Sequence, residues 1–205
     1  MARRLVVVDA DMGCDDAVAL LLLLRARSTV EIMALTTVAG NVGVKQAIKN
    51  ASAVFKSMDK PEIPIYEGSA GPLIRNNNLK LWAGHGSDGL GDSGLSANVD
   101  LRMIQPIHAV QALIEIFKSK PGQIELLALG PLTNLALATR IDPSFPGNIK
   151  HLTIMGGCES AKGNSSMAAE FNFFADPEAA HIVLDSFTAE SILPVGYPPH
   201  PLLSN

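Results

Sequence analysis

Short apolar runs alternate along the chain with longer segments whose apolar residues recur at helical spacing. Apolar, β-branched runs that end in polar residues are typical of strands buried in a parallel sheet. The predicted strands are Leu5–Val8, Val30–Val38, Ile63–Tyr66, Ile124–Leu129, His151–Met155 and Ile192–Val195. The predicted helices are Asp15–Arg27, Val44–Met58, Pro106–Ser119, Leu132–Thr139 and Asp176–Leu184. This alternation implies right-handed crossovers, so we expect an α/β fold with an open, mainly parallel sheet and helices on both faces.

The ends of three helices carry their own signals. Asp15 and Asp16 at one helix start suit the positive end of the helix dipole. Asp176 is the expected N-cap of the last helix, with Pro177 in its first turn, and Pro106 is expected in the first turn of an earlier helix.

Two long segments interrupt the alternation. Glu67–Gln105 is rich in glycine, and Gly156–Ala175 is mostly polar. Loops of this length inside a compact domain are usually functional or mobile. These two loops are therefore candidates for functional or mobile segments.

Composition narrows the class of protein. The chain has 205 residues, 47% hydrophobic and 18% charged, which predicts one globular domain spanning 1–205. A formal net charge of −4 argues against a nucleic-acid partner. Cys14 and Cys158 are too few and too far apart for a disulfide framework or a zinc knuckle. The apolar stretch Ala17–Leu24 is far shorter than the roughly 20 residues that span a bilayer, and Leu5–Val8 is too short for a signal peptide, so we expect a cytoplasmic protein without membrane contact.

Four carboxylates fall close together at the end of the first predicted strand: Asp9, Asp11, Asp15 and Asp16. Open α/β sheets bind their ligands at the carboxyl ends of strands. Like charges this close raise one another's pKa unless a positive charge lies among them, and the segment contains no Lys, Arg or His. A hard divalent cation such as Ca²⁺ or Mg²⁺ would supply that charge. The alternative is that Asp15 and Asp16 only cap a helix, while Asp9 and Asp11 are solvated.

The motif Asp-x-Asp also begins phosphatases that form an aspartyl phosphate, but those expect a threonine shortly afterwards, where this chain has Gly13-Cys14-Asp15. The complete pattern from Asp9 to Ala17, Asp-x-Asp-x-Gly-x-Asp-Asp-Ala, instead resembles the signature of the inosine-uridine-preferring nucleoside hydrolases. Further matches follow in the family's order at Thr37–Asn41, His85–Gly91, Leu129–Ala136, Met155–Gly157, Gly163–Asn172 and Asp176–Ala180. The resemblance covers Arg4 to about Leu184, and residues 185–205 diverge.

The resemblance implies a Rossmann-like nucleoside-hydrolase fold and Ca²⁺-dependent hydrolysis of the N-glycosidic bond between ribose and a nucleobase. By similarity, Asp11, Asp16 and the backbone carbonyl of Leu129 would bind the Ca²⁺, and Asp9 would orient this shell from behind. Asp11 would be the catalytic residue that deprotonates a Ca²⁺-held water for attack on the anomeric carbon.

The same resemblance implies a ribonucleoside substrate and, in the family, homo-oligomers. It assigns Asp15 and Asn172 to the 2′ and 3′ hydroxyls, Glu170 and Asn164 to the 5′ end, and Asn41 to their vicinity.

For several of these residues, a purely structural role is an alternative to the binding role. Asn41 and Asn164 each follow a glycine and could be turn residues. His85 either lines the base pocket or is solvated. Glu170 and Asn172 would point to the same side if their segment were extended.

The family continues beyond the point where this chain stops. In the family, the continuation carries a His-Asp pair. The segment Tyr197–Asn205 contains a histidine but no aspartate after it. We therefore expect a chain truncated at its C-terminus, with weak or absent hydrolase activity. The alternatives are a non-catalytic, ribose- or metal-binding short isoform that acts by association with a full-length relative, and an unstable fragment.

Overall fold

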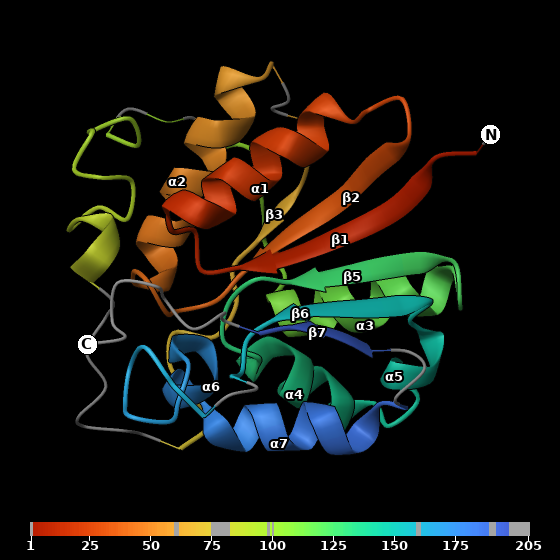
Figure 1. Ribbon diagram of the computed structural model, residues 1–205. Helices are drawn as coiled ribbons and strands as arrows, with labels where there is room; N and C mark the ends of the chain where they lie inside the picture. The colour runs from red at the N-terminus through yellow and green to blue at the C-terminus, as the bar shows by residue number, and fades with distance from the viewer. Residues whose placement is uncertain are drawn as a thin grey trace.

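The computed structural model describes residues 2–59, 62–74, 83–97, 99, 101–158, 161–188 and 192–196. Its centre is a parallel sheet of seven strands (Figure 1). The strands are β1 (Arg4–Ala10), β2 (Val30–Thr37), β3 (Ile65–Tyr66), β4 (Ile104–Gln105), β5 (Ile124–Ala128), β6 (His151–Met155) and β7 (Ile192–Val195). The helices are α1 (Cys14–Arg25), α2 (Val44–Ser57), the 3₁₀ turn η1 (Ala83–His85), α3 (Ala109–Ser119), α4 (Thr133–Ile141), α5 (Phe145–Asn148), α6 (Phe171–Ala175) and α7 (Pro177–Ser186).

The strand order β4-β3-β2-β1-β5-β6-β7 reverses direction in the middle of the sheet. From β1 the chain builds outward through β2, β3 and β4, and then returns to add β5 on the other side of β1. The loop that leaves the carboxyl end of β1 therefore runs to one face of the sheet, and the loop that leaves β5 runs to the other. Such a switch point opens a crevice for ligands.

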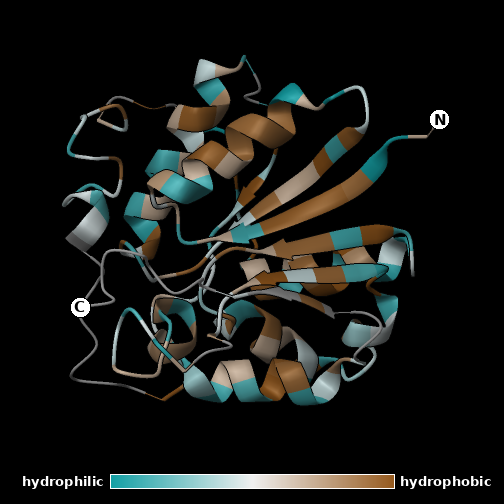
Figure 2. Cartoon of the chain, viewed as in Figure 1, coloured by the Kyte–Doolittle hydropathy of each residue, from teal (hydrophilic) through white to brown (hydrophobic). Residues whose placement is uncertain are grey.

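Helices cover both faces of the sheet (Figure 1). On one face α1 and α2 pack over β1 and β2, with Leu20 and Phe55 among the fully buried side chains. On the other face α3, α4, α5 and α7 bury a second cluster that includes Phe117 and Phe145, whose rings meet edge to face. Hydrophobic residues dominate the central strands (Figure 2), as two-sided burial requires. The expected α/β fold, with an open parallel sheet and helices on both faces, is confirmed.

Several predicted boundaries are wrong. Pro106 does not open α3, because the N-cap is His108, whose Nδ1 accepts a hydrogen bond from Val110 N. The long loop contains the short strand β4, and the second loop contains α6. By contrast, Asp176 is the N-cap of α7, as expected, and its Oδ1 accepts from Ala179 N at 3.0 Å.

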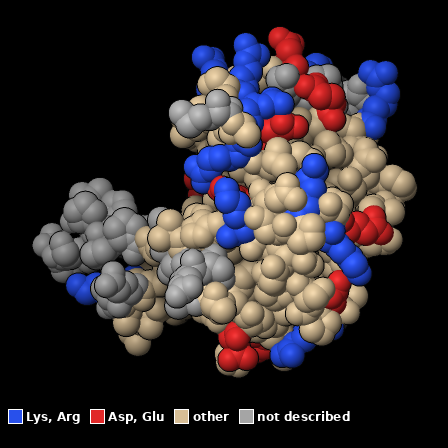
Figure 3. Space-filling model, turned by 90° about the vertical axis from the view of Figure 1, so that its right-hand side faces the viewer, with Lys and Arg blue, Asp and Glu red and all other residues tan. Residues whose placement is uncertain are grey.

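The surface mixes both signs of charge. Figure 3 shows Lys and Arg interspersed with Asp and Glu on the face that it presents, in keeping with the small net charge. Within the described ranges, no helix is long and apolar enough to cross a bilayer.

Candidate active site

Buried polar side chains gather where β1, β2 and β5 end. Asp9 lies at the end of β1, Asp11 follows it, and Leu129 follows β5, with Leu129 N donating to Asp9 O at 2.8 Å. Most globular proteins bury carboxylates only when these are paired or bound to a metal. The buried polar residues of this region include Asp9, Asp11, Asp16, Thr36, Asn41, Asn134, Glu170 and Asn172.

Asn41 connects the loop after β2 to Asp11. Its backbone N donates to Asp11 Oδ2, and its Nδ2 donates to Asp11 Oδ1 at 3.0 Å. A Cβ placed on Gly13 would lie 2.6 Å from Asn41 Nδ2 and 2.9 Å from Asp15 Oδ1. Asn41 therefore does more than form a turn, because it orients Asp11 and lies beside Asp15.

Asp16 has two differently placed oxygens. Its Oδ2 accepts from Gly13 N, the N-cap of α1, at 2.9 Å. Its Oδ1 is buried and accepts no hydrogen bond within the described part of the chain. Helix capping thus accounts for one oxygen of Asp16 and leaves the other without a partner.

Burial shifts the titration of both carboxyl groups. It raises the pKa of Asp11 to about 6, against the backbone hydrogen bond from Asn41 that lowers it. Burial, followed by the negative charge of Asp11, raises the pKa of Asp16 well above its ordinary value. The pair therefore carries less than its full negative charge unless a cation lies beside it.

Asp9 lies behind this pair and is fully buried. Its Oδ1 accepts from Thr36 Oγ1 and from Asn134 Nδ2, the latter at 2.8 Å, while its Oδ2 is unpartnered among described residues. Burial raises the pKa of Asp9 to about 7, although both hydrogen bonds lower it. Asn134 also donates to Thr37 O at 2.9 Å and accepts from Ser69 N at 2.9 Å.

Neither Thr36 nor Asn134 has a role that is predicted from the sequence. Asn134 belongs to the matching segment Leu129–Ala136, and that membership was its only signal. Its three contacts depend on chain segments that meet only in the folded sheet.

Leu129, whose carbonyl is the expected metal ligand, lies beside Asn172, which is expected to bind a ribose hydroxyl. Asn172 Nδ2 donates to Leu129 O at 2.9 Å and to Met155 O at 3.0 Å. A carbonyl oxygen has two lone pairs, so Leu129 O keeps one for a further partner. This contact joins the loops after β5 and β6 at the switch point.

The segment around Glu170 is not extended, which corrects the expected alternation. Glu170 is the N-cap of α6, and its carboxylate accepts from Asn172 N at 2.8 Å, Phe173 N at 3.2 Å and Gly157 N at 3.0 Å. Burial raises the pKa of Glu170, and these backbone donors lower it. Asn172 is consequently placed on the first turn of a helix.

His85 and Asn164 differ in how they reach the site. His85 Nε2 lies 3.4 Å from Asp15 Oδ1, and the Asp15 side chain is 47% exposed. Asn164 N donates to Ala169 O at 3.1 Å, and its Oδ1 accepts from Ser165 Oγ at 3.3 Å, so its hydrogen bonds stay inside its own loop. The structure brings His85 to the acidic residues, whereas the hydrogen bonds of Asn164 go to Ala169 and Ser165 of its own loop.

The donor set fits a hard cation. Asp11, Asp16 and Leu129 offer only oxygen atoms, one of them the unpartnered Asp16 Oδ1. Within the described residues, no Lys or Arg forms an ion pair with these carboxylates, and no group of three or more His, Cys, Asp or Glu side chains is arranged to hold a metal. Two carboxylates and a carbonyl would leave the remaining positions of a six- to eight-coordinate Ca²⁺ to other oxygens.

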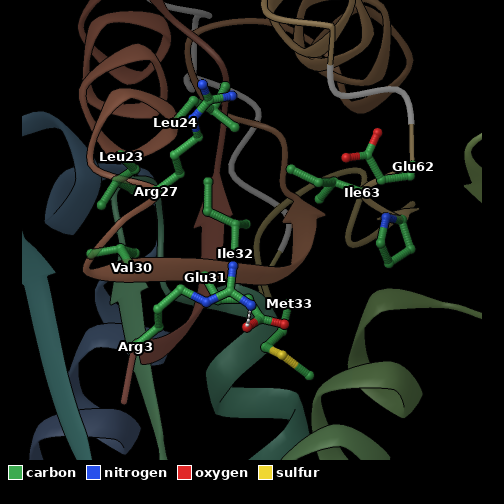
Figure 4. A pocket seen from close by; sticks show the side chains of 11 residues that line it. Arg3, Leu23, Leu24, Arg27, Val30, Glu31, Ile32, Met33, Glu62 and Ile63 are labelled. Carbon is green, nitrogen blue, oxygen red and sulfur yellow. Dashed lines mark ion pairs between the residues drawn. The ribbon is translucent and has the colours of Figure 1, made fainter. Parts of the chain in front are cut away.

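Hollows in the described part of the surface include one near the buried carboxylates and one far from them. One, of about 530 Å³, borders Glu170 and is lined also by Phe173, Phe174 and Pro177. The other, of about 320 Å³, opens at the opposite end of the sheet, where β2 begins. Figure 4 shows Arg3 paired there with Glu31 (2.6 Å), far along the strand from the buried carboxylates. We place the candidate site at the carboxyl ends because the buried carboxylates of Asp9, Asp11 and Asp16 lie together there.

Comparisons with known proteins agree with this geometry. Residues 6–197 match the family described as "Inosine-uridine preferring nucleoside hydrolase". The chain is 42% identical over 184 residues to "Probable uridine nucleosidase 1" of Oryza sativa subsp. japonica, covering 90% of this chain and 56% of that protein. It is 36% identical over 183 residues to the "Inosine-uridine preferring nucleoside hydrolase" of Leishmania major, covering 89% and 57%.

Solved structures give the same answer. An "Inosine-Guanosine Nucleoside Hydrolase" superposes with a TM-score of 0.86 at 35% identity, covering 96% of this chain and 60% of that one. A plant nucleoside hydrolase superposes with a TM-score of 0.88 at 35% identity, covering 95% and 60%. The chain thus spans between half and two thirds of the length of these relatives. A match over nearly the whole of this chain, together with the parallel sheet and its acidic switch point, shows that the chain belongs to the inosine-uridine preferring nucleoside hydrolase family.

Proposed function

We propose that this chain hydrolyses the N-glycosidic bond of ribonucleosides, releasing ribose and a free nucleobase. The observation that carries the proposal is the buried pair Asp11 and Asp16 at the switch point, with the unpartnered Asp16 Oδ1 and no basic residue paired to it in the described chain. Relatives named for uridine and for inosine make both nucleosides candidate substrates.

Asp11, Asp16 and the carbonyl oxygen of Leu129 would hold a divalent cation, for which we propose Ca²⁺. When bound, such a cation lowers the pKa of water and so supplies a nucleophile near neutral pH. Asp9 would orient these ligands from behind, because Thr36 and Asn134 hold its carboxylate in place at the end of β1.

Asp11 would take the proton from the water that attacks the anomeric carbon. Its two oxygens are oriented by Asn41, which leaves the carboxylate little freedom to rotate. A cation bound beside it would favour the charged form of Asp11, the form that a general base needs.

Ribose binding would fall to side chains around this carboxylate. Asp15 and Asn172 lie on the first turns of α1 and α6, where the Asp15 carboxylate and Asn172 Oδ1 could accept from the 2′ and 3′ hydroxyls. Glu170, bordering the larger hollow, would face the 5′ end, with Asn164 in the adjoining loop. Hydroxyl contacts that tighten as the ribose gains oxocarbenium character would speed bond cleavage.

The direct test is base release from inosine and from uridine in the presence of Ca²⁺. We expect Asp11→Ala to lower turnover at least 1,000-fold, because it removes both the base and a ligand. Asp59→Asn, an exposed substitution that also removes one carboxylate, should leave turnover unchanged. Absence of turnover in the unmodified chain would contradict hydrolysis, and calorimetric binding of ribose in that case would support a non-catalytic binding protein.

A further inference from the structure

The loop that carries His85 is bonded chiefly to itself. We define the His85 loop as residues 83–97. Within it, the Asp88 carboxylate accepts from Leu90 N at 2.7 Å, Asp92 N at 2.8 Å and Gly94 N at 3.2 Å. These bonds give the loop a defined internal shape, but they do not fix where the loop lies relative to the acidic residues.

Asn50 of α2 makes a buried polar connection between this loop and the body of the protein. Its side chain is fully buried. One Nδ2 hydrogen is donated to Met12 O at 3.0 Å and the other to Asp88 O at 2.8 Å. Both protons of the amide are used, so Asn50 joins the segment after Asp11 directly to the His85 loop.

A second residue of α2 holds the amide of Asn50 in this orientation. Gln46 Nε2 donates to Asn50 Oδ1 at 2.9 Å and to Ser96 Oγ at 2.8 Å. Rotating the Asn50 amide would exchange an acceptor for a donor at every contact. The contacts therefore select one side-chain orientation.

The backbone on both sides of Asn50 is adapted to close approach. Met12 has a φ of 57°, a left-handed conformation in a non-glycine residue directly after Asp11. Gly89 has a φ of 79°, and a Cβ there would lie 2.7 Å from Val42 Cγ1 and 3.0 Å from Asn50 Nδ2. Cys14 Sγ also donates to Gly89 O at 3.5 Å. The loop can lie this close to α2 only with glycine at position 89.

We propose that Asn50 is a positioning residue that sets the approach of His85 to Asp15 by holding the His85 loop against Met12. The role deepens the proposed function, on which it rests, because Asp15 is the proposed ligand of the ribose hydroxyls. Asn50 contacts neither the acidic side chains nor, in this assignment, the substrate. It acts through the backbone carbonyls of Met12 and Asp88.

Amide hydrogen exchange measured by mass spectrometry tests this role without requiring activity. Asn50→Leu retains volume but loses both donors, and we expect exchange in the His85 loop to speed up at least tenfold, while peptides from β1 and β5 keep their rates. Ser52→Ala, another buried polar position on α2 whose Oγ contacts Met103 Sδ, should change neither. Unchanged loop exchange in Asn50→Leu, or an equal acceleration in β1, would overturn the proposal.

A second variant approaches the contact from the loop side and leaves α2 intact. Gly89→Ala and Gly94→Ala both place alanine at positive φ, 79° and 69°, but a Cβ at Gly94 meets nothing within 4 Å. We expect the larger acceleration of loop exchange in Gly89→Ala. Equal effects of the two substitutions would show only backbone strain and would refute the role of the Asn50 contact.

Steady-state kinetics then relate the position of the loop to catalysis. We expect Asn50→Leu to lower kcat for nucleoside hydrolysis about 10- to 100-fold, as misplacement of a binding group does, with a smaller change in KM because the hydroxyl contacts strengthen in the transition state. An unchanged kcat would overturn the positioning role. A wild-type chain without turnover would contradict the proposed function alone, and the exchange comparison would still decide whether Asn50 holds the loop.

Discussion

At the scale of single residues, the candidate site depends on amide side chains that hold carboxylates in place. Asn41 orients Asp11. Asn134 donates to Asp9, from which it is separated by 125 positions along the chain. The carboxylates were predictable because four of them within eight positions is an unusual local pattern. Their amide partners were harder to predict, because a single asparagine in a sequence is as well explained by a turn.

Asn134→Leu should destabilise the protein. The substitution leaves Thr37 O and Ser69 N without partners in a fully buried position, and each buried group left unsatisfied costs about 1–3 kcal/mol. We expect the free energy of unfolding to fall by about 2–6 kcal/mol in urea titrations.

The matched control for Asn134→Leu is Thr139→Val, on the same helix. The Thr139 hydroxyl donates to Leu135 O at 2.9 Å, a carbonyl that the helix already satisfies, so the expected loss is below about 0.5 kcal/mol. Equal losses in the two variants would show that the contacts of Asn134 carry no special weight.

At the scale of elements, segments with a clear apolar pattern were predictable, and short elements without one were not. The sequence placed α1, α2 and β6 to within a few residues, since their apolar patterns reflect burial. It missed β4, α5 and α6, which have two, four and five residues. Such short elements form because neighbouring strands or caps stabilise them: β4 pairs with β3, and Glu170 caps α6. The helix start predicted at Pro106 was wrong for a similar reason, because the side chain of His108 caps α3.

The amino ends of the strands are joined by a charge cluster with a testable pH dependence. Arg4 of β1 donates to both oxygens of Glu125 on β5, and Lys150 Nζ donates to Glu125 Oε1 at 3.0 Å. The hydrogen bond from Arg4, first of all, holds the pKa of Glu125 below its ordinary 4.5. A carboxylate with a lowered folded-state pKa stabilises the protein above its unfolded pKa, and this contribution is lost as the pH falls through the folded value.

Glu125→Gln should therefore lower the free energy of unfolding at pH 7 by less than about 1 kcal/mol, since Arg4 and Lys150 are largely exposed. The difference from wild type should shrink as the pH falls below 4.5. Urea titrations at several pH values measure both variants. Asp59→Asn, which removes an exposed charge, serves as the control, and a deficit in Glu125→Gln that grows toward acid pH would contradict the assignment.

At the scale of the whole molecule, the strand order determines where chemistry can occur. The reversal between β1 and β5 brings together the ends of β1, β2, β5 and β6, and with them carboxylates, amides and a carbonyl from four loops. The chain leaves β1 and β5 toward opposite faces of the sheet at this point. Polar groups can therefore be buried in the crevice between the loops, outside the two hydrophobic clusters.

Calcium should stabilise the folded chain through this region. At a free Ca²⁺ concentration 100 times the dissociation constant, binding to the native state adds about 2.7 kcal/mol, which raises the unfolding midpoint by roughly 5–10 °C for a chain of this size. Addition of EDTA should reverse the shift. Differential scanning calorimetry provides the measurement.

The companion variant is Asp16→Asn, which retains an acceptor for Gly13 N but removes one proposed ligand charge. We expect a much smaller response to Ca²⁺ and a higher midpoint without metal, because a buried, unpartnered carboxylate has been replaced. Asp59→Asn should respond like the wild type. A full Ca²⁺ shift in Asp16→Asn would contradict the proposed ligand set.

The sequence by itself determined the fold class, the location of the acidic residues at a strand end and the family, because periodic burial and a dense local motif leave marks within short stretches of chain. Only the tertiary structure decided which partners those carboxylates have. Asn134 behind Asp9, Asn172 against Leu129 O and Asn50 between Met12 and Asp88 all join segments far apart in sequence. Hydrogen bonds of this kind depend on strand order and on exact approach in space, and no local pattern of residues encodes either.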